Sequence, residues 1–151
     1  MLHIYVDADA CPVKLEVYRV AQRYNLEVTL VANSRMKVPF YPWLKLVVVN
    51  DQFDAADNWI VEHCGKDDIV ITADILLADR CIKNGALVLG ATGKEFTEDT
   101  IGGAVAMRDL MSELRESGLV GGGGAPFQPK DRSRFLQNLD QMIQRVKNRN
   151  K

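Results

Sequence analysis

Residues 2–13 read LHIYVDADACPV, and this stretch sets the fold expected of the whole chain. The run from Leu2 to Val6 is short and apolar and stops at Asp7, which is typical of a buried strand. Pro12 then stands where a helix tolerates proline best, at its first position, with Cys11 before it as a weak cap. Apolar side chains follow at helical spacing: Val13, Val17, Val20, Ala21 and Tyr24. The chain is therefore expected to open with a strand that leads directly into a helix.

The same alternation of strand and helix continues along the chain. Its patterns predict further strands over 27–32, 46–49, 69–71 and 86–89, and helices over about 51–64, 74–84, 98–116 and 131–147. Pro39 and Pro42 make residues 35–43 a loop. This spacing favours an α/β fold, with residues 1–151 forming a single domain whose mostly parallel sheet has about five strands flanked by helices. A Gly-rich hinge is expected at 118–130, around the run Gly121 to Gly124, before the amphipathic C-terminal helix at about 131–147.

Composition excludes several classes of protein. With 151 residues and 47% apolar side chains, the chain can bury one proper core. The formal net charge of −1 supplies no general field for nucleic acid or anionic membranes, so a polyanion would need a local basic patch. The three cysteines form no CxxC pair, which argues against a disulfide framework and a zinc site. The sequence starts without a basic signal-peptide region and has no run of the roughly 18–20 apolar residues that span a membrane, so we expect a cytoplasmic protein without membrane contact, and no feature indicates an oligomeric state.

Aspartates gather where the predicted strands end and helices begin. A carboxylate at the carboxyl end of a parallel strand faces the crevice in which α/β sheets bind ligands. Several carboxylates there repel one another unless a hard cation such as Mg²⁺ or Mn²⁺ neutralises them. The sequence therefore predicts a Mg²⁺ or Mn²⁺ site with five candidate ligands: Asp7, Asp9, Asp57, Asp74 and Asp79.

Structural roles compete with metal binding at most of these positions. The structural alternative for Asp9 is a helix cap or a charge that stabilises the positive end of a helix, and for Asp74 it is the N-cap of its helix. Asp79 lies mid-helix, where its side chain could simply be solvated. Asp57 is expected a full turn into its helix, beyond the reach of a capping role, and Asp7 at the strand end has the weakest structural alternative.

Four stretches together resemble a known family. They are VDADACPVK at 6–14, VNDQFDAAD at 49–57, ITADILLADRCIKNGALVL at 71–89 and GGGGAPFQPKDRSRF at 121–135, and they look like the uncharacterised bacterial YaiI/YqxD family. That family is similar in pattern to the PIN-like (PIN/NYN-type) nucleases, and Thr72-Ala73-Asp74 looks like their T-x-D motif. The resemblance implies a PIN-like fold, with metal-ligand roles on Asp7, Asp57, Asp74 and Asp79 and with Asp9 as an addition.

The function expected from this resemblance is divalent-metal-dependent cleavage of phosphodiester bonds, in RNA rather than DNA. Asp7, Asp57 and Asp74 are the expected catalytic residues. RNA would be bound through local basic patches, and the hinge would let Lys130 and Arg132 close over a phosphate. The expected substrate-binding residues are Asn33, Ser34, Arg35, Lys37, Thr72, Lys130 and Arg132. Turn formation at Asn33 and Ser34 and solvated basic faces elsewhere are the structural alternatives.

Two other functions remain open from the residues alone. The spacing Asp7-Ala8-Asp9 also resembles the D-x-D opening of haloacid-dehalogenase-type phosphatases, in which the first aspartate is the nucleophile. A catalytically inactive module that binds metal or RNA would carry the same ligands without turnover.

Overall fold

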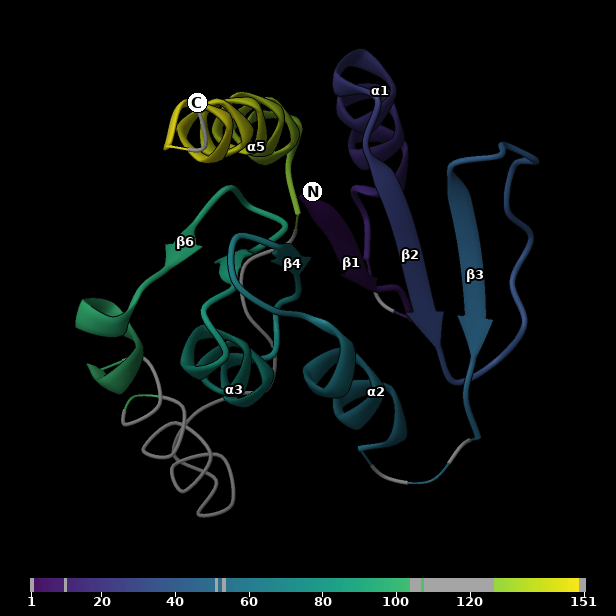
Figure 1. Ribbon diagram of the computed structural model, residues 1–151, viewed down its shortest axis with the longest axis horizontal. Coiled ribbons are helices and arrows are strands. Elements are labelled where there is room, and N and C mark those ends of the chain that lie inside the picture. The colour runs from purple at the N-terminus through teal and green to yellow at the C-terminus, as the bar shows by residue number, and fades with distance from the viewer. Residues whose placement is uncertain are drawn as a thin grey trace.

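Six strands form one sheet in the order β3-β2-β1-β4-β5-β6, and all neighbours are parallel except β5 and β6. This computed structural model describes residues 2–9, 11–50, 52, 54–103, 107 and 127–149 (Figure 1). The strands are β1 (His3–Asp7), β2 (Glu27–Ala32), β3 (Leu44–Val48), β4 (Ile69–Ile71), β5 (Leu87–Leu89) and β6 (Glu95–Phe96). The predicted α/β class with a mostly parallel sheet is confirmed. The two-residue antiparallel β6 is a sixth strand that the sequence pattern did not indicate.

Helices cover both faces of the sheet (Figure 1). One face carries α1 (Lys14–Tyr24) and α5 (Pro129–Arg149), and the other carries α2 (Ala55–His63) and α3 (Ile75–Lys83). The strands supply both cores by alternation: Ile4 and Val6 of β1 pack on the α1/α5 side, while Tyr5 packs on the α2/α3 side. The chain thus forms a single doubly wound domain.

Two helices begin later than the sequence pattern predicted. Helix α1 starts at Lys14 with Val13 as its N-cap residue and no side-chain cap, so the expected start at Pro12 with a Cys11 cap is wrong. Helix α2 starts at Ala55 after Asp54, whose φ of 68° places it in the left-handed region. Asp57 therefore lies in the first turn of α2, and the expectation that it lies a full turn beyond the helix start is also wrong.

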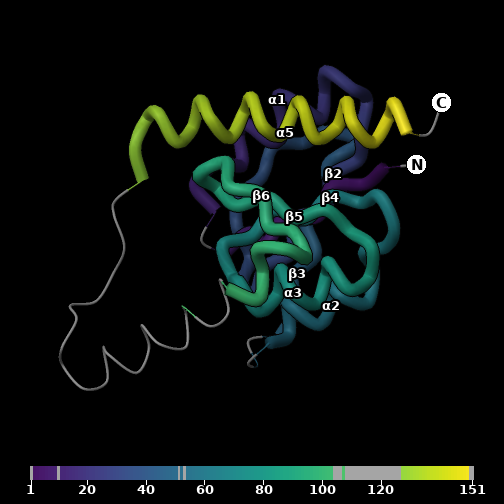
Figure 2. The backbone as a smooth tube through the Cα atoms, turned by 90° about the vertical axis from the view of Figure 1, so that its left-hand side faces the viewer, coloured from purple at the N-terminus to yellow at the C-terminus, as the bar shows by residue number. Residues whose placement is uncertain are grey.

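Helix α5 runs along α1 and reaches over the β5–β6 turn (Figure 2). Tyr24 of α1 donates to Asp140 over 2.6 Å, and Asn138 donates to the carbonyl of Gly93 over 2.6 Å. Gly93 has a φ of 91°, and a Cβ there would lie 2.7 Å from Cγ of Arg134. The close approach explains why this turn needs glycine.

Other parts of the chain fall partly outside the described residues. Residues 98–103 are helical, and of the rest of the helix predicted over 98–116 only residue 107 is described. The run Gly121 to Gly124 and most of the predicted hinge at 118–130 lie outside the described residues. Among the described helices, none has the length and apolar character needed to cross a membrane.

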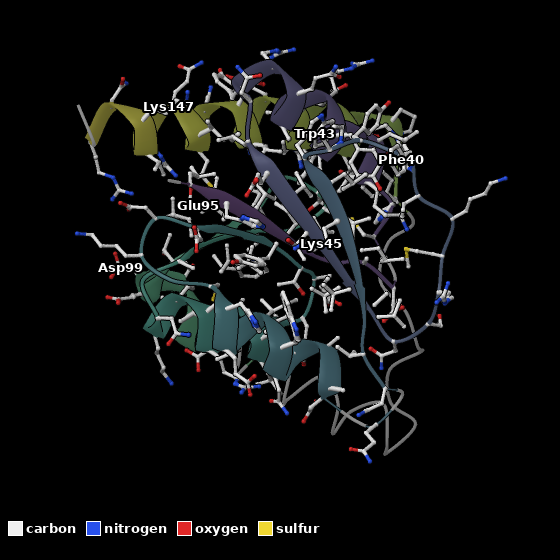
Figure 3. All side chains as sticks on the ribbon, turned by 45° about the vertical axis from the view of Figure 1, so that its right-hand side comes forward. Phe40, Trp43, Lys45, Glu95, Asp99 and Lys147 are labelled. Atoms are coloured by element: carbon white, nitrogen blue, oxygen red, sulfur yellow. The ribbon has the colours of Figure 1, made fainter. Side chains whose placement is uncertain are left out.

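The predicted loop over 35–43 lies between β2 and β3, and because these strands are parallel it leads away from their carboxyl ends. It starts at Asn33, beside the end of β2, and returns to the amino end of β3, where Phe40 and Trp43 lie (Figure 3). Trp43 stacks on Tyr41 with ring centroids 4.8 Å apart. Only the first few residues of this loop are therefore near the candidate site.

Candidate metal and phosphate site

The strand order places the candidate site at a topological switch point. From β1 the chain moves outward through β2 to β3, and then returns to the opposite side of β1 to form β4. In open α/β sheets, ligands bind at the carboxyl ends of the two strands where this reversal occurs. Here those ends carry Asp7 of β1 and Thr72, which directly follows β4.

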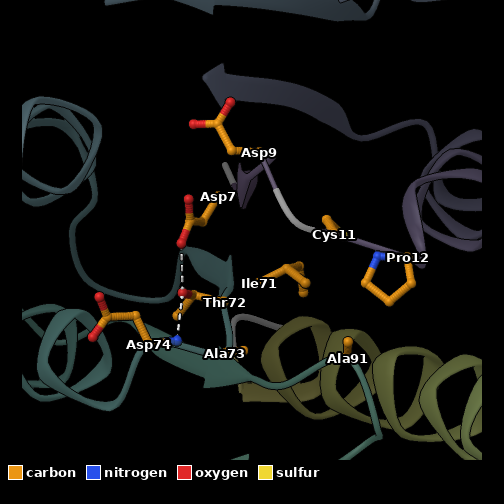
Figure 4. A pocket seen from close by; sticks show the side chains of 9 residues that line it. All are labelled: Asp7, Asp9, Cys11, Pro12, Ile71, Thr72, Ala73, Asp74 and Ala91. Carbon is orange, nitrogen blue, oxygen red and sulfur yellow. Dashed lines mark hydrogen bonds between the residues drawn. The ribbon is translucent and has the colours of Figure 1, made fainter. Parts of the chain in front are cut away.

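A hydroxyl group joins the two strand ends. Thr72 Oγ1 donates to Oδ2 of Asp7 over 2.9 Å and accepts the amide of Asp74 over 3.0 Å (Figure 4). Thr72 is 3% exposed, so water competes little for its hydroxyl. The three residues form one ordered unit, with the side chain of Thr72 directed at the Asp7 carboxylate.

Asp74 serves as the N-cap of α3, as one alternative reading of the sequence allowed. Its Oδ1 accepts the amides of Leu76 and Leu77 over 2.9 and 3.3 Å. Among the described residues Oδ2 has no hydrogen-bond donor. The cap thus fixes the carboxylate and leaves Oδ2 without a donor among the described residues, so capping does not use both oxygens of Asp74.

Strand alternation turns Asp7 toward the α2/α3 side, the side on which Tyr5 packs. The first turn of α2 brings Asp57 to the same end of the sheet. Burial, followed by the charges of Asp74 and Asp7, raises the pKa of Asp57 to about 6. Burial also raises the pKa of Asp7, against the hydrogen bond from Thr72, and the charges of Asp74 and Asp9 add to the rise. The charges of neighbouring aspartates thus disfavour the ionised forms of Asp57 and Asp7.

Asp9 fixes the neighbouring strand end. Its Oδ2 accepts the backbone amide of Asn33 over 2.9 Å, which joins the β1–α1 connection to the end of β2. Asn33 thus contributes a backbone group here, and Ser34 beside it is exposed. This contact supports the turn reading of Asn33.

A cavity of about 310 Å³ opens beside these carboxylates (Figure 4). Asp7, Asp9 and Asp74 line one side of it. The remaining lining is mainly apolar and consists of Cys11, Pro12, Ile71, Thr72, Ala73 and Ala91. Burial raises the pKa of the Cys11 thiol, which disfavours the thiolate that a nucleophilic role would require.

The carboxylates do not form a ready-made cage for a cation. Within the described residues, no group of three or more His, Cys, Asp or Glu side chains has the spacing needed to hold a metal ion. The available donors are nevertheless hard oxygens, and Mg²⁺ is usually held by one or two carboxylates together with water and substrate phosphate. Asp7 and the free oxygen of Asp74 fit that manner of binding, since their mutual repulsion would be relieved by a cation.

The other predicted ligand, Asp79, is engaged elsewhere. It forms an ion pair with Lys83 one turn along α3, with Nζ 3.0 Å from Oδ2. Asp79 also does not line the cavity. The structure therefore brings Asp7, Asp9, Asp57 and Asp74 to one end of the sheet and places Asp79 in a helix-surface pair.

The predicted phosphate-binding cations differ in their surroundings. Arg132 donates to the buried carboxylate of Glu16 over 2.6 Å and to the carbonyl of Pro12 over 2.9 Å, so its guanidinium holds α5 against the start of α1. Lys130, Arg35 and Lys37 are exposed, and none has a carboxylate partner among the described residues.

One cation near the site was missed from the sequence. Lys14 lies at the start of α1, and its Nζ donates to the carbonyl of Ala8 over 3.3 Å and contacts Sδ of Met36 at 3.7 Å. Ala8 stands between Asp7 and Asp9. The available signal was the lysine that ends VDADACPVK, but the contact with Met36 comes from a loop 22 residues away.

Known proteins match this chain over nearly its whole length, including the residues of the candidate site. A family model described as "Uncharacterized BCR, YaiI/YqxD family" matches residues 5–145. A UPF0178 protein of Rhodospirillum rubrum is 56% identical over 147 residues, which cover 97% of this chain and 98% of that protein. A UPF0178 protein of Nitrobacter winogradskyi is 53% identical over 146 residues, with 97% of this chain and 93% of that protein covered. A search of the solved structures gives no significant match.

Proposed function

This chain belongs to the YaiI/YqxD family, and we propose that it is a Mg²⁺- or Mn²⁺-dependent nuclease that hydrolyses phosphodiester bonds, in RNA in preference to DNA. The observation that carries the proposal is the Asp7–Thr72–Asp74 unit at the switch point between β1 and β4. The PIN-like relationship inferred from the sequence belongs to the same proposal. It is supported by acidic residues at the ends of the first and fourth strands.

Three of the carboxylates at this end of the sheet are the proposed ligands of the metal ion. Asp7 and the free Oδ2 of Asp74 are the proposed metal ligands, and Thr72 holds Asp7 in position through its hydroxyl. A bound divalent cation would neutralise the scissile phosphate and lower the pKa of a water molecule. Asp9 lies on the same cavity wall and is the proposed additional ligand.

Asp57 is suited to carrying a proton. Its pKa of about 6 lies close to neutral pH, so it can both accept and release a proton under ordinary conditions. That property fits a group that takes a proton from the attacking water or returns one to the leaving oxygen. Asp57 does not itself line the cavity, but Asp7, whose pKa burial also raises, does. Carboxylates with a perturbed pKa at a cavity are a common mark of catalytic sites.

Cleavage of a labelled single-stranded RNA in Mn²⁺ tests the proposal. We expect turnover by the wild-type protein and a loss of at least about a hundredfold in Asp7→Asn and Asp74→Asn. Asp67→Asn is the matched control, because Asp67 pairs with Arg149 away from the cavity and its φ of 69° suits asparagine equally well. RNA left intact by the wild-type protein at all Mn²⁺ concentrations, or equal turnover in Asp7→Asn, would overturn it.

The phosphatase alternative predicts a different intermediate. Asp7 would form an aspartyl phosphate, which beryllium fluoride imitates on a nucleophilic carboxylate. A stable beryllium fluoride adduct that forms on the wild-type protein and not on Asp7→Asn would favour the phosphatase over the nuclease. Metal binding and RNA binding without turnover or an adduct would favour the inactive module.

A further inference from the structure

The cavity beside the carboxylates has two chemically different sides. Figure 4 shows Asp7, Asp9 and Asp74 on one side, with Cys11, Pro12 and Ala91 opposite them. The volume of about 310 Å³ is at the lower end of the range, roughly 300–1,000 Å³, found for small-ligand sites. A metal ion with its waters uses only the acidic side and leaves the apolar side unexplained.

Lys14 does not line the cavity, but its ammonium group contacts the carbonyl of Ala8, the residue between the lining residues Asp7 and Asp9. Its ammonium group has three donors, but the described contacts are one long hydrogen bond to the carbonyl of Ala8 and a thioether contact with Met36. Within the described part of the chain, Lys14 has no carboxylate partner. It can therefore still accept an anionic group as a partner.

These features fit a ligand that is flat and apolar at one end and anionic at the other. A base stacked inside a duplex cannot enter a concave cavity, whereas an unpaired base can leave its neighbours and be held on its faces. Carboxylates accept hydrogen bonds and do not donate them when ionised, so the ribose 2′-hydroxyl is a suitable donor to this wall.

We propose that the cavity holds one unpaired nucleotide of single-stranded RNA, with its base against Pro12, Ile71 and Ala91 and its phosphate beside Lys14. This inference rests on the proposed nuclease function and names its substrate as unpaired RNA. It also assigns Lys14 to phosphate binding, a role that no motif indicated.

Binding of 5′-AMP and adenosine, followed by NMR in Ca²⁺ to limit cleavage of the RNA competitor, tests the inference. Ala91→Phe would fill the apolar side without changing any charge, and we expect it to raise the Kd of both compounds by about tenfold. Lys14→Gln should raise the Kd of 5′-AMP about fivefold and leave that of adenosine unchanged, because only the nucleotide carries a phosphate. A single-stranded RNA hexamer should displace 5′-AMP, whereas the same sequence in a duplex should not.

Two results would overturn the inference. One is an unchanged 5′-AMP affinity in Ala91→Phe together with unchanged affinity in the milder Ala91→Leu, provided that both variants keep the amide spectrum of a folded protein. The other is equal competition by duplex and single strand.

A separate titration distinguishes failure of this inference from failure of the proposed function. Mn²⁺ binding is measured without nucleotide, and adenosine binding is measured without metal. If adenosine binds at the cavity but the protein does not bind Mn²⁺, the proposed nuclease function is refuted and the nucleotide site stands. If Ala91→Phe cleaves RNA as fast as the wild-type protein does, the nucleotide site is refuted and the proposed nuclease function stands.

Discussion

The hydroxyl of Thr72 lies 2.9 Å from Oδ2 of Asp7 and connects the ends of two neighbouring strands whose residues are 65 positions apart in the sequence. The same oxygen accepts the amide of Asp74 at the start of α3. A single buried side chain thus connects the Asp7 carboxylate to the backbone of Asp74, the two residues that matter most for the proposed function. Its removal should affect stability and metal binding together.

Thr72→Val tests this connection, because valine keeps the shape and removes the hydroxyl. We expect the free energy of unfolding to fall by about 1–2 kcal/mol, since the amide of Asp74 and the Asp7 carboxylate both lose a buried partner. Mn²⁺ affinity should fall in parallel. Urea unfolding and a Mn²⁺ titration measure the two effects, and Thr72→Ser, which restores the hydroxyl, should recover most of both. Full Mn²⁺ affinity in Thr72→Val would contradict the positioning role.

Asp57 should make the metal-free protein less stable as pH rises. Burial and the charges of Asp74 and Asp7 raise its pKa from 3.8 to about 6, so the folded state binds more protons than the unfolded state between these values. This contribution to stability is complete below about pH 4 and is lost as pH rises through 6. Asp57→Asn should therefore be more stable than the wild-type protein at pH 7, by about 1 kcal/mol once solvent screening of the partly exposed carboxylate is allowed for.

Urea unfolding at pH 4, 5.5 and 7 in the presence of a chelator measures this difference. Asp67→Asn removes the same charge but breaks an ion pair with Arg149, so it should not stabilise the protein at pH 7. If the difference in the free energy of unfolding between Asp57→Asn and the wild-type protein does not grow with pH, then the folded protein does not disfavour the ionised form of Asp57.

Gly93 should tolerate no side chain. A Cβ would lie 2.7 Å from Cγ of Arg134 and 3.0 Å from its backbone carbon, and the φ of 91° already disfavours other residues. We expect Gly93→Ala to cost about 1–3 kcal/mol, because α5 must move away from the β5–β6 turn. Gly65→Ala is the matched control, since, apart from its chain neighbours, no heavy atom of the described residues lies within 4 Å of its added Cβ. Thermal unfolding of the two variants provides the comparison, and equal Tm values would contradict the close packing of α5.

The sequence identified the fold class well because strand and helix periodicity is local. Strands β2 and β4 begin and end where their apolar runs do, and Asp7 and Asp74 follow from the strand ends. Helix starts were less predictable: nothing in the pattern showed that the chain would turn at Asp54 in a left-handed conformation, which moves Asp57 into the first turn.

The roles of basic side chains depend on contacts across long stretches of sequence. Arg132 and its partner Glu16 are 116 residues apart, and a buried glutamate in a surface helix gives no local sign of its partner. Lys14 resembles any lysine in the first turn of a helix until the loop carrying Met36 folds beside it. Patterns of charge therefore suggested an RNA surface on the segment around Lys130 and Arg132, whereas the structure shows Arg132 occupied.

RNA binding should depend on the cations that have no carboxylate partner in the described part of the chain. Arg35 and Lys37 are exposed in the loop that starts beside Asp9, while Arg145 and Arg149 are paired with Glu95 and Asp67. For single strands, each phosphate contact contributes about 0.7 to the slope of log Kd against log salt. The double variant Arg35→Ala/Lys37→Ala should thus lower the slope by about 1.4, the sum of two such contacts.

The matched double variant Arg145→Ala/Arg149→Ala removes the same charge, and it should leave that slope nearly unchanged because both guanidinium groups are already neutralised. Arg132→Ala should likewise keep the slope while lowering the free energy of unfolding by about 1–3 kcal/mol, because it leaves the Glu16 carboxylate without its partner. Fluorescence anisotropy of a labelled RNA, measured from 50 to 200 mM salt in Ca²⁺ to limit cleavage, gives the slopes. A slope that falls in Arg132→Ala and stays constant in Arg35→Ala/Lys37→Ala would place the RNA along α5 instead, as the charge pattern of the sequence first suggested.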